Sequence, residues 1–292
     1  MTGNPLEASK LADVIDLADE STTCEALPDY PIQVNGASGV LINDSLPMVC
    51  GGFHGQIETG NCYIAGSNES VAKLLTPREY TVAIEIGAQM WITGGLYGSY
   101  LESTEIVDMS SVVEGPQLPK AMGGHCAVKV SETKVFFMHG YKTYFYDFLT
   151  NAWTNGPDMT YDRVYFGCGI MNTIAKSGVV VVTAGGFRLG TGSKTEFLTL
   201  DDPNGLQWTP GPDLPKPLYL LKMIEFGDTA IAIGGTSYDG LHPSNSLYKL
   251  VCYHGTNCEW KEMSQKLRVA RFDFVAMLIP DWMTNCKKIS QN

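Results

Sequence analysis

The sequence of 292 residues has no long apolar run and no excess of basic charge. Its most apolar stretch, residues 178–183, has the length of a strand, whereas a helix that spans a bilayer needs roughly 18 or more apolar residues in a row. Only 20 Lys and Arg stand against 31 Asp and Glu, and the net charge of −11 repels nucleic-acid phosphates and anionic lipid surfaces. We therefore expect no nucleic-acid partner and no membrane insertion.

The common motifs of catalysis and metal binding are also missing. There is no C-x-x-C pair and no G-x-S-x-G elbow. The glycine-rich residues 185–194 end in Lys194 without the spacing of a phosphate loop. The histidines form no H-x-x-x-H pair; they are His54, His125, His139, His242 and His254. We therefore expect no catalytic residues, no metal and no cofactor.

The first residues lack the basic segment and the apolar region of a signal peptide. Eight cysteines and two Asn-x-Ser sequons, at Asn43 and Asn68, nevertheless favour an oxidising compartment. We expect an extracellular glycoprotein, secreted or on the cell surface, whose signal peptide is absent from this chain. The alternative is a cytosolic protein with eight buried thiols.

A repeat of about 43 to 49 residues runs through the chain. Its marks are paired glycines at 51–52, 94–95, 185–186 and 234–235, with His139-Gly140 between the second and third pairs. Before each mark lies a short branched or aromatic run, and these runs are residues 47–50, 90–93, 135–138, 179–184 and 230–233. The period is the length of one four-stranded propeller blade, and each run is typical of a blade's second strand.

Third and fourth strands follow each glycine mark. The expected third strands are residues 62–65, 104–107, 144–147, 195–198 and 246–250. The expected fourth strands carry Trp153, Trp208 and Trp260 in three of the repeats. A tryptophan at this position can cover the contact with a neighbouring blade.

This pattern resembles the kelch repeat, and the resemblance covers nearly the whole chain. It is most similar to the cysteine-containing extracellular kelch-like proteins of invertebrates. The resemblance implies an all-β, six-bladed β-propeller of kelch type that occupies residues 1–292 as one domain. Five blades are expected at residues 36–76, 79–119, 123–160, 164–214 and 218–264.

The sixth blade must be shared between the two ends of the chain, residues 10–28 with 268–287. Residues 271–279 and 282–284 are expected as its first and second strands, and residues 13–17 and 23–27 as its third and fourth. Joining the ends in one sheet removes the exposed strand edges that invite aggregation.

The cysteines are interpreted as four disulfides. Cys252–Cys258 would join the third and fourth strands of the fifth blade, and Cys50–Cys62 the second and third strands of the first. Cys126–Cys168 would join the first strands of neighbouring blades. Cys24–Cys286 follows by exclusion, although the inferred strand register places these two at different ends of the sixth blade.

Binding through loops is the function that this scaffold favours. Loops between second and third strands and between fourth and first strands emerge on one face of the ring, which we call the loop face, and loops on a rigid scaffold often carry function. The candidate ligand-binding residues on it are Arg78, Tyr97, Tyr141, Arg163, Arg188 and Tyr238, a Tyr- and Arg-rich set typical of interfaces. Arg78, Arg163 and Arg271 recur at the start of first strands, so a structural role for these three is an equal alternative.

We therefore expect a non-catalytic, monomeric binding or scaffold module that recognises a protein or a glycan. The alternative is a propeller enzyme, a hydrolase or an oxidase, with its site in the central funnel. Convergent histidines or paired titratable groups in that funnel would favour the enzyme.

Overall fold

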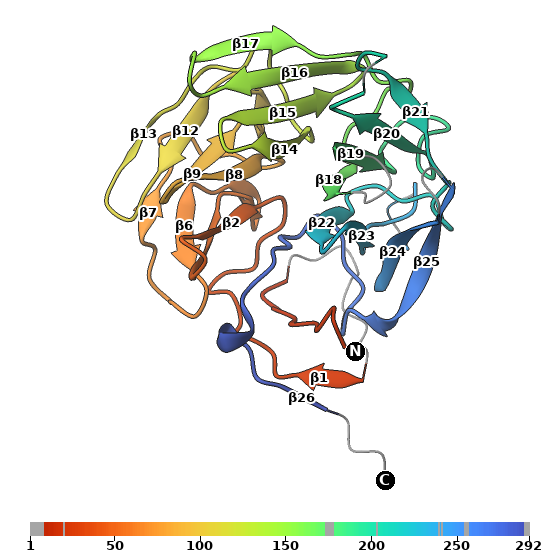
Figure 1. Cartoon of the computed structure of the whole chain (residues 1–292). Coiled ribbons are helices and arrows are strands. Elements are labelled where there is room, and N and C mark those ends of the chain that lie inside the picture. Colours follow the sequence, from red (N-terminus) through yellow and green to blue (C-terminus); the bar gives the residue numbers. More distant parts are fainter. Residues whose placement is uncertain are drawn as a thin grey trace.

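The computed structural model describes residues 9–19, 21–172, 178–202, 204–238, 240, 242–253 and 257–288. Five four-stranded antiparallel sheets stand around a central axis like the blades of a propeller (Figure 1). In every sheet the strands pair in chain order. Figure 1 shows the first strand of each sheet innermost and the fourth outermost.

The sheets are numbered here by their order in the chain. Sheet 1 contains β2 (Ser38–Ile42), β3 (Leu46–Cys50), β6 (Asn61–Ile64) and β7 (Ala72–Lys73). Sheet 2 contains β8 (Val82–Ile86), β9 (Gln89–Thr93), β12 (Thr104–Val107) and β13 (Val112–Glu114). Sheet 3 contains β14 (Cys126–Ser131), β15 (Lys134–His139), β16 (Lys142–Asp147) and β17 (Ala152–Asn155). Sheet 4 contains β18 (Gly167–Asn172), β19 (Val179–Ala184), β20 (Thr195–Thr199) and β21 (Trp208–Pro210). Sheet 5 contains β22 (Lys222–Phe226), β23 (Thr229–Ile233), β24 (Ser246–Tyr253) and β25 (Asn257–Lys266).

The remaining elements are short. Loops between second and third strands contain the hairpins β4 (Phe53–His54) with β5 (Ile57–Glu58) and β10 (Leu96–Tyr97) with β11 (Ser99–Tyr100). A single 3-10 turn, η1 (Asp281–Met283), precedes β26 (Cys286–Lys288), which pairs with β1 (Thr22–Cys24).

The second strands lie in the middle of the core. β19 and β23 are buried along nearly their whole length. Sheets 3 and 5 cover the two faces of β19, whereas sheet 4 and the terminal segments cover those of β23. A run of branched residues such as Val179–Ala184 suits this place, since every position needs an apolar side chain that fits a pleated surface.

Tryptophans of the outer strands tie neighbouring sheets together. Trp153 Nε1 donates to the carbonyl of Gln117 at 2.9 Å, and Trp208 Nε1 to that of Pro157 at 3.0 Å. Trp260 Nε1 donates to Thr195 Oγ1 at 3.0 Å. Each bond reaches the preceding sheet or the loop after it, so the fourth-strand tryptophan covers a blade contact.

A closed ring of backbone hydrogen bonds surrounds the axis. Each member has a left-handed φ, donates its N–H to the preceding member and accepts from the next. The members are Gly36, Tyr80, Gly124, Tyr165, Leu220 and Asp273, with N···O distances from 2.6 to 3.1 Å. The ring therefore has six members, although the described residues form only five four-stranded sheets.

The prediction of a four-stranded sixth blade is wrong for the described residues. Residues 13–17 and 271–279 form no strands, and residues 282–283 belong to η1. What joins the two ends is the β1–β26 pair (Figure 1). The inferred register was also wrong, because Cys24 and Cys286 lie directly opposite each other in this pair. No turn connects the two terminal segments, so nothing local fixes a hairpin register between them.

Candidate functional site

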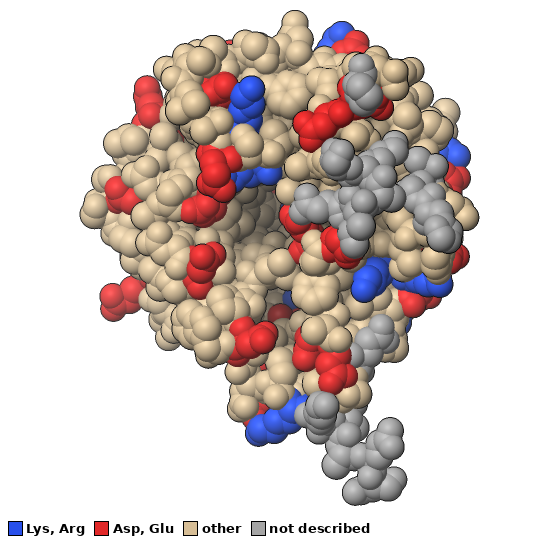
Figure 2. All heavy atoms as spheres, viewed as in Figure 1, with Lys and Arg blue, Asp and Glu red and all other residues tan. Residues whose placement is uncertain are grey.

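Tyrosine and carboxylate side chains gather at the axis, where Figure 2 shows the molecule hollowed. The rings of Tyr80 and Tyr165 meet edge to face, with centroids 5.0 Å apart. Tyr165 Oη lies 3.3 Å from Tyr100 Oη. Gly124 separates the two tyrosines in the backbone ring, and a Cβ there would meet the Tyr165 ring. The absence of a side chain at Gly124 thus makes room for the Tyr165 ring in this edge-to-face pair.

Two nearly buried carboxylates flank Gly36 in the same ring. Glu79 is 7% exposed and Asp273 is 4% exposed. An oxygen of each lies 3.3 Å from the point that a Cβ on Gly36 would occupy. Burial, reinforced by the Asp273 charge, raises the pKa of Glu79 to about 7. Burial also raises the pKa of Asp273 to about 6, although the Lys222 charge opposes this shift.

A lysine and a histidine lie at the beginnings of two first strands, Lys222 in β22 and His125 directly before β14. Burial lowers the pKa of Lys222 at the start of β22, while the Asp273 charge opposes that shift. His125 accepts or donates a 2.9 Å hydrogen bond at Nε2 with Thr93 Oγ1. Burial, with the nearby charges of His139 and Lys222, lowers the pKa of His125 to about 3, so this ring is neutral at pH 7.

A cavity of about 620 Å³ lies between the terminal segments and sheets 1 and 5. Its lining is mainly apolar side chains, among them Ile224 and Phe226 of β22 and Phe274 of the C-terminal segment. Asp273 also belongs to the lining, so the cavity reaches one carboxylate of the pair, and Glu79 lies beyond it across Gly36.

Exposed aromatic side chains stand on the loop face. Tyr97 and Tyr141 are each 50% exposed and Tyr238 is 45% exposed. Tyr238 stacks on Phe187 with centroids 4.8 Å apart. Arg188, about half exposed, forms a 3.5 Å ion pair with Asp162. These four candidates are accessible, but they come from the loops of four different sheets.

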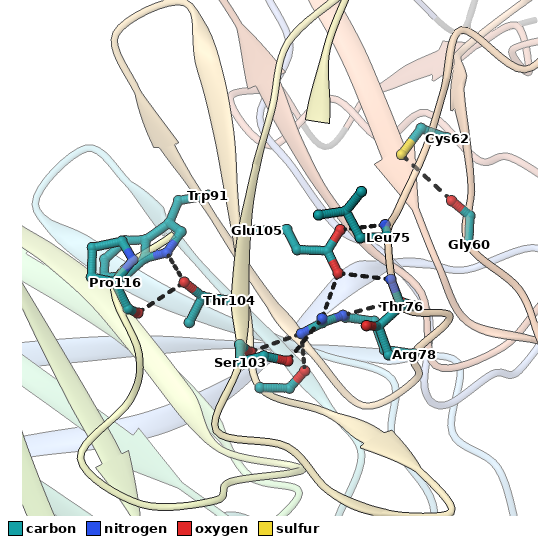
Figure 3. Close-up of polar contacts among 11 residues, drawn as sticks. Gly60, Cys62, Leu75, Thr76, Arg78, Trp91, Ser103, Thr104, Glu105 and Pro116 are labelled. Carbon is teal, nitrogen blue, oxygen red and sulfur yellow. Dashed lines mark hydrogen bonds and ion pairs between the residues drawn. The ribbon is translucent and has the colours of Figure 1, made fainter. Parts of the chain in front are cut away.

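Arg78 and Arg163 are not exposed, which corrects their place among the ligand-binding candidates. Both side chains are 0% exposed. Arg78 donates to Glu105 at 2.5 Å and to the carbonyl oxygens of Gly94 and Ser103 (Figure 3). Arg163 donates to Glu196 at 3.1 Å and to two carbonyls. Each guanidinium is thus used to bind a loop to a third strand.

Arg271 repeats this arrangement at the end of the chain. It donates to Asp13 Oδ2 at 2.9 Å and to the carbonyl of Leu11. Three residues earlier in the chain, the N–H of Arg268 donates to Asp13, just as the N–H of Leu75 donates to Glu105. Asp13 therefore takes the part that a third-strand glutamate takes in sheets 2 and 4.

The four disulfides coincide with the pairs expected from the sequence, Cys24–Cys286, Cys50–Cys62, Cys126–Cys168 and Cys252–Cys258. Three of them join directly paired residues of adjacent strands. Cys126–Cys168 instead joins β14 to β18 and so staples sheet 3 to sheet 4.

Both sequon asparagines are exposed and lie away from the loop face. Asn43 is in the turn between β2 and β3, and Asn68 is in the loop between β6 and β7. Because successive strands alternate in direction, these loops emerge on the opposite face.

Two kinds of feature are absent from the described residues. No grouping of three or more His, Cys, Asp or Glu side chains in this part of the chain is suited to a metal ion. None of its helices is long and apolar enough to cross a membrane. His254, one of the five histidines considered above, lies outside the described residues.

No protein-family model matches the sequence, and no curated protein matches it. Among solved structures, that of YjhT is similar to this chain, with a TM-score of 0.68 and 14% sequence identity. The match covers 86% of this chain and 89% of the YjhT chain. At this identity the likeness shows the fold alone. The chain is an all-β propeller.

The axial residues are the part of the site that sequence reasoning missed. Glu79 and Asp273 stand one and two residues after the recurring arginines Arg78 and Arg271. A carboxylate one or two residues after each of these arginines was the signal that the sequence offered. It does not reveal that two carboxylates so far apart in the chain meet around Gly36.

Proposed function

We propose that the protein is a non-catalytic extracellular recognition module, secreted or on the cell surface, which binds a protein or a glycan through its loop face as a monomer. The observation that carries the proposal is the exposure of Tyr97, Tyr141 and Tyr238 on loops that rest on a propeller scaffold. Tyrosine supplies a large contact area at a low cost in conformational entropy.

We further propose that the propeller is of kelch type and has six modules. The six-membered backbone ring supports this count, with Asp273 as its sixth member. The Arg271–Asp13 contact supports a sixth module built from both ends of the chain, because it repeats the Arg–Glu contacts of sheets 2 and 4.

Four disulfides and two exposed sequons support the extracellular assignment. Glycans on Asn43 and Asn68 would stand on the face opposite to the exposed tyrosines and leave the proposed binding face free. Expression in eukaryotic cells behind a heterologous signal peptide tests this point. We expect secretion with glycans that an endoglycosidase removes from the native protein; retention in the cell as an unglycosylated, reduced protein would contradict it.

The binding proposal is tested with a glycan array and a panel of immobilised extracellular proteins. The triple variant Tyr97→Ala, Tyr141→Ala, Tyr238→Ala is expected to lose at least tenfold in affinity for any ligand found. Tyr253→Ala is the matched control, because Tyr253 is 41% exposed on the β24–β25 hairpin of the opposite face. The loop face would be rejected as the binding site if no ligand were found, or if the triple variant bound the ligand as tightly as the unmodified protein.

The second candidate is a hydrolase that uses the central funnel. The Glu79 and Asp273 pair favours it, because the two raised pKa values allow one carboxyl to act as acid and the other as base near neutral pH. Hydrolysis of nitrophenyl esters and glycosides that falls at least about 100-fold in Glu79→Gln would support it. Equal rates in both proteins would reject it.

A further inference from the structure

The cavity between the terminal segments combines an apolar body with an acidic end. Four carboxylates and two bases belong to its lining: Asp13, Asp16, Asp273, Asp281, Lys10 and Arg271. Arg271 is already paired with Asp13, and Arg268 binds the same carboxylate. The net charge of the side chains that line the cavity is therefore negative. A volume of about 620 Å³ lies in the range of cavities that hold small molecules.

Hydrogen-bond acceptors without donors converge where the cavity approaches the axis. Asn35 belongs to the lining, and its buried Oδ1 has no hydrogen-bond partner. The Glu79 carboxylate, next to Asp273 across Gly36, has no hydrogen bond or ion pair within the described part of the chain. Buried acceptors are normally satisfied, so the unpaired Oδ1 of Asn35, in a cavity that also has the Asp273 carboxylate in its lining, points to a ligand that brings donors.

The charges near this point leave room for one more cation. Asp273, Glu79 and Glu58 are the carboxylates that act on one another here, and Lys222 is the cation that acts on Asp273. Lys222 can compensate one carboxylate of the adjacent pair but not both. An alkylammonium group offers three N–H donors and a single positive charge, which matches what is missing.

We propose that this cavity binds a small amphipathic amine, with its ammonium group at Asp273, Glu79 and Asn35 and its alkyl part among the apolar side chains. The apolar wall beside Asp273 is formed by Val34, Ala37 and Phe274. Burial of the alkyl chain there is expected to tighten binding about fourfold per methylene. The charged end supplies selectivity against alcohols and acids of the same length.

The same geometry predicts that binding becomes tighter as the pH rises. Asp273 and Glu79 ionise between pH 5 and pH 8, with pKa values of about 6 and 7, whereas an alkylamine stays protonated over this range. Asp13, Asp16, Glu58, Lys10, Lys222 and Arg271 are the other charged groups that face the cavity or the pair. Affinity is expected to rise about tenfold from pH 5 to pH 8, because Asp273 is mostly protonated at the lower value.

Calorimetry on the oxidised full chain tests the proposal. The ligands are decylamine, decanol and decanoate, each below its micelle concentration. Butylamine, which carries the ammonium group on a short alkyl chain, is the fourth ligand. Decylamine is expected to bind at least about tenfold more tightly than each of the other three. Asp273→Asn is expected to weaken decylamine at least about tenfold and to flatten its pH dependence. Glu79→Gln provides the same readout if Asp273→Asn does not fold. Asp158→Asn is the matched control, since it removes one charge from an exposed carboxylate on the loop face.

Three results would overturn the proposal. Equal affinity for decylamine, decanol and decanoate would remove the role of the carboxylates. Equal affinity for butylamine and decylamine would remove the role of the cavity. Decylamine binding that is absent, or unchanged in both Asp273→Asn and Glu79→Gln, would show that the cavity with its carboxylates is not an amine site. The binding of a protein or glycan on the loop face is measured separately and does not depend on these outcomes.

Discussion

Around the axis, six residues adopt a left-handed backbone conformation, yet only Gly36 and Gly124 are glycines. The others are Tyr80, Tyr165, Leu220 and Asp273, and a left-handed φ costs a residue with a Cβ about 1–2 kcal/mol. Each donates a backbone hydrogen bond to the preceding member of the ring and accepts one from the next, and three of the four place a polar or aromatic side chain at the axis. Strain of this kind collects at functional sites, which agrees with the axial position of the carboxylate pair.

Gly124→Ala tests the packing at this ring. A Cβ at φ +63° meets the Tyr165 ring, so we expect a loss of about 2–4 kcal/mol from backbone strain and overpacking together. Gly98→Ala is the control, because Gly98 has φ +67° but open space within 4 Å, and it is expected to cost only about 1 kcal/mol. Urea denaturation of both variants measures the difference; equal losses would show that Tyr165 does not need the space.

The carboxylate pair predicts a pH dependence of stability. The folded-state pKa values of Glu79 and Asp273, about 7 and 6, lie above the ordinary values of these groups. The contribution of the two carboxyl groups to the free energy of unfolding is therefore complete below about pH 4 and is lost as the pH rises to about 7. The free energy of unfolding should therefore fall less steeply over pH 4–7 in Glu79→Gln and Asp273→Asn, with the slope from these groups reduced by about half in each. Urea midpoints measured across this range check it. An unchanged slope in both variants would mean that the two carboxyl groups titrate normally.

Among the elements, the second strands are held by burial and the outer ones by specific bonds. Trp153, Trp208 and Trp260 each donate a side-chain hydrogen bond to the preceding sheet or to the loop after it. The buried Arg78–Glu105 and Arg163–Glu196 pairs bind the loop before one first strand to a third strand of the same sheet. Neighbouring blades are therefore coupled by side chains as well as by apolar packing.

The disulfides should contribute unequally to the free energy of unfolding, and the contribution should increase with the length of the chain segment that each disulfide encloses. Cys126–Cys168 closes 42 residues between two sheets, whereas Cys252–Cys258 closes 6 within one hairpin. Replacing both cysteines by alanine is expected to cost about 4 kcal/mol for the first and about 2 kcal/mol for the second by the loop-entropy relation. Denaturant unfolding of the two double variants measures the order. A larger loss at Cys252–Cys258 would mean that native-state packing outweighs chain entropy.

At the scale of the whole molecule, the two ends of the chain close the ring. Arg268 and Arg271 hold Asp13, and Cys24–Cys286 spans a separation of 262 residues. These contacts replace the four-stranded ladder that every other module has. The cavity of about 620 Å³ lies in this region, where segments without strands fill the space less completely than a sheet.

Removal of residues 1–27 is expected to destabilise the whole protein. The deletion removes Asp13 and Cys24 and leaves Arg271 and the flanks of sheets 1 and 5 without their partners. We expect the melting temperature to fall by more than about 10 °C, because several kcal/mol are lost together. The Cys24→Ala, Cys286→Ala double variant separates the disulfide from the packing. Melting of the truncated chain at the temperature of the full chain would reject closure by the two ends.

The sequence by itself determined the strands and their order in five sheets, because glycine pairs, branched runs and fourth-strand tryptophans are local signals that recur at a fixed spacing. It also led to three disulfide pairs from the positions of cysteines on the expected strands, and to Cys24–Cys286 by exclusion. Only the tertiary structure decided the burial of Arg78 and Arg163, because Glu105 and Glu196 reach them from strands 27 and 33 residues away. It likewise decided the incomplete sixth sheet and the meeting of Glu79 with Asp273 around Gly36. These depend on how the ring closes in space, and no local pattern encodes the distance between residues at opposite ends of a chain.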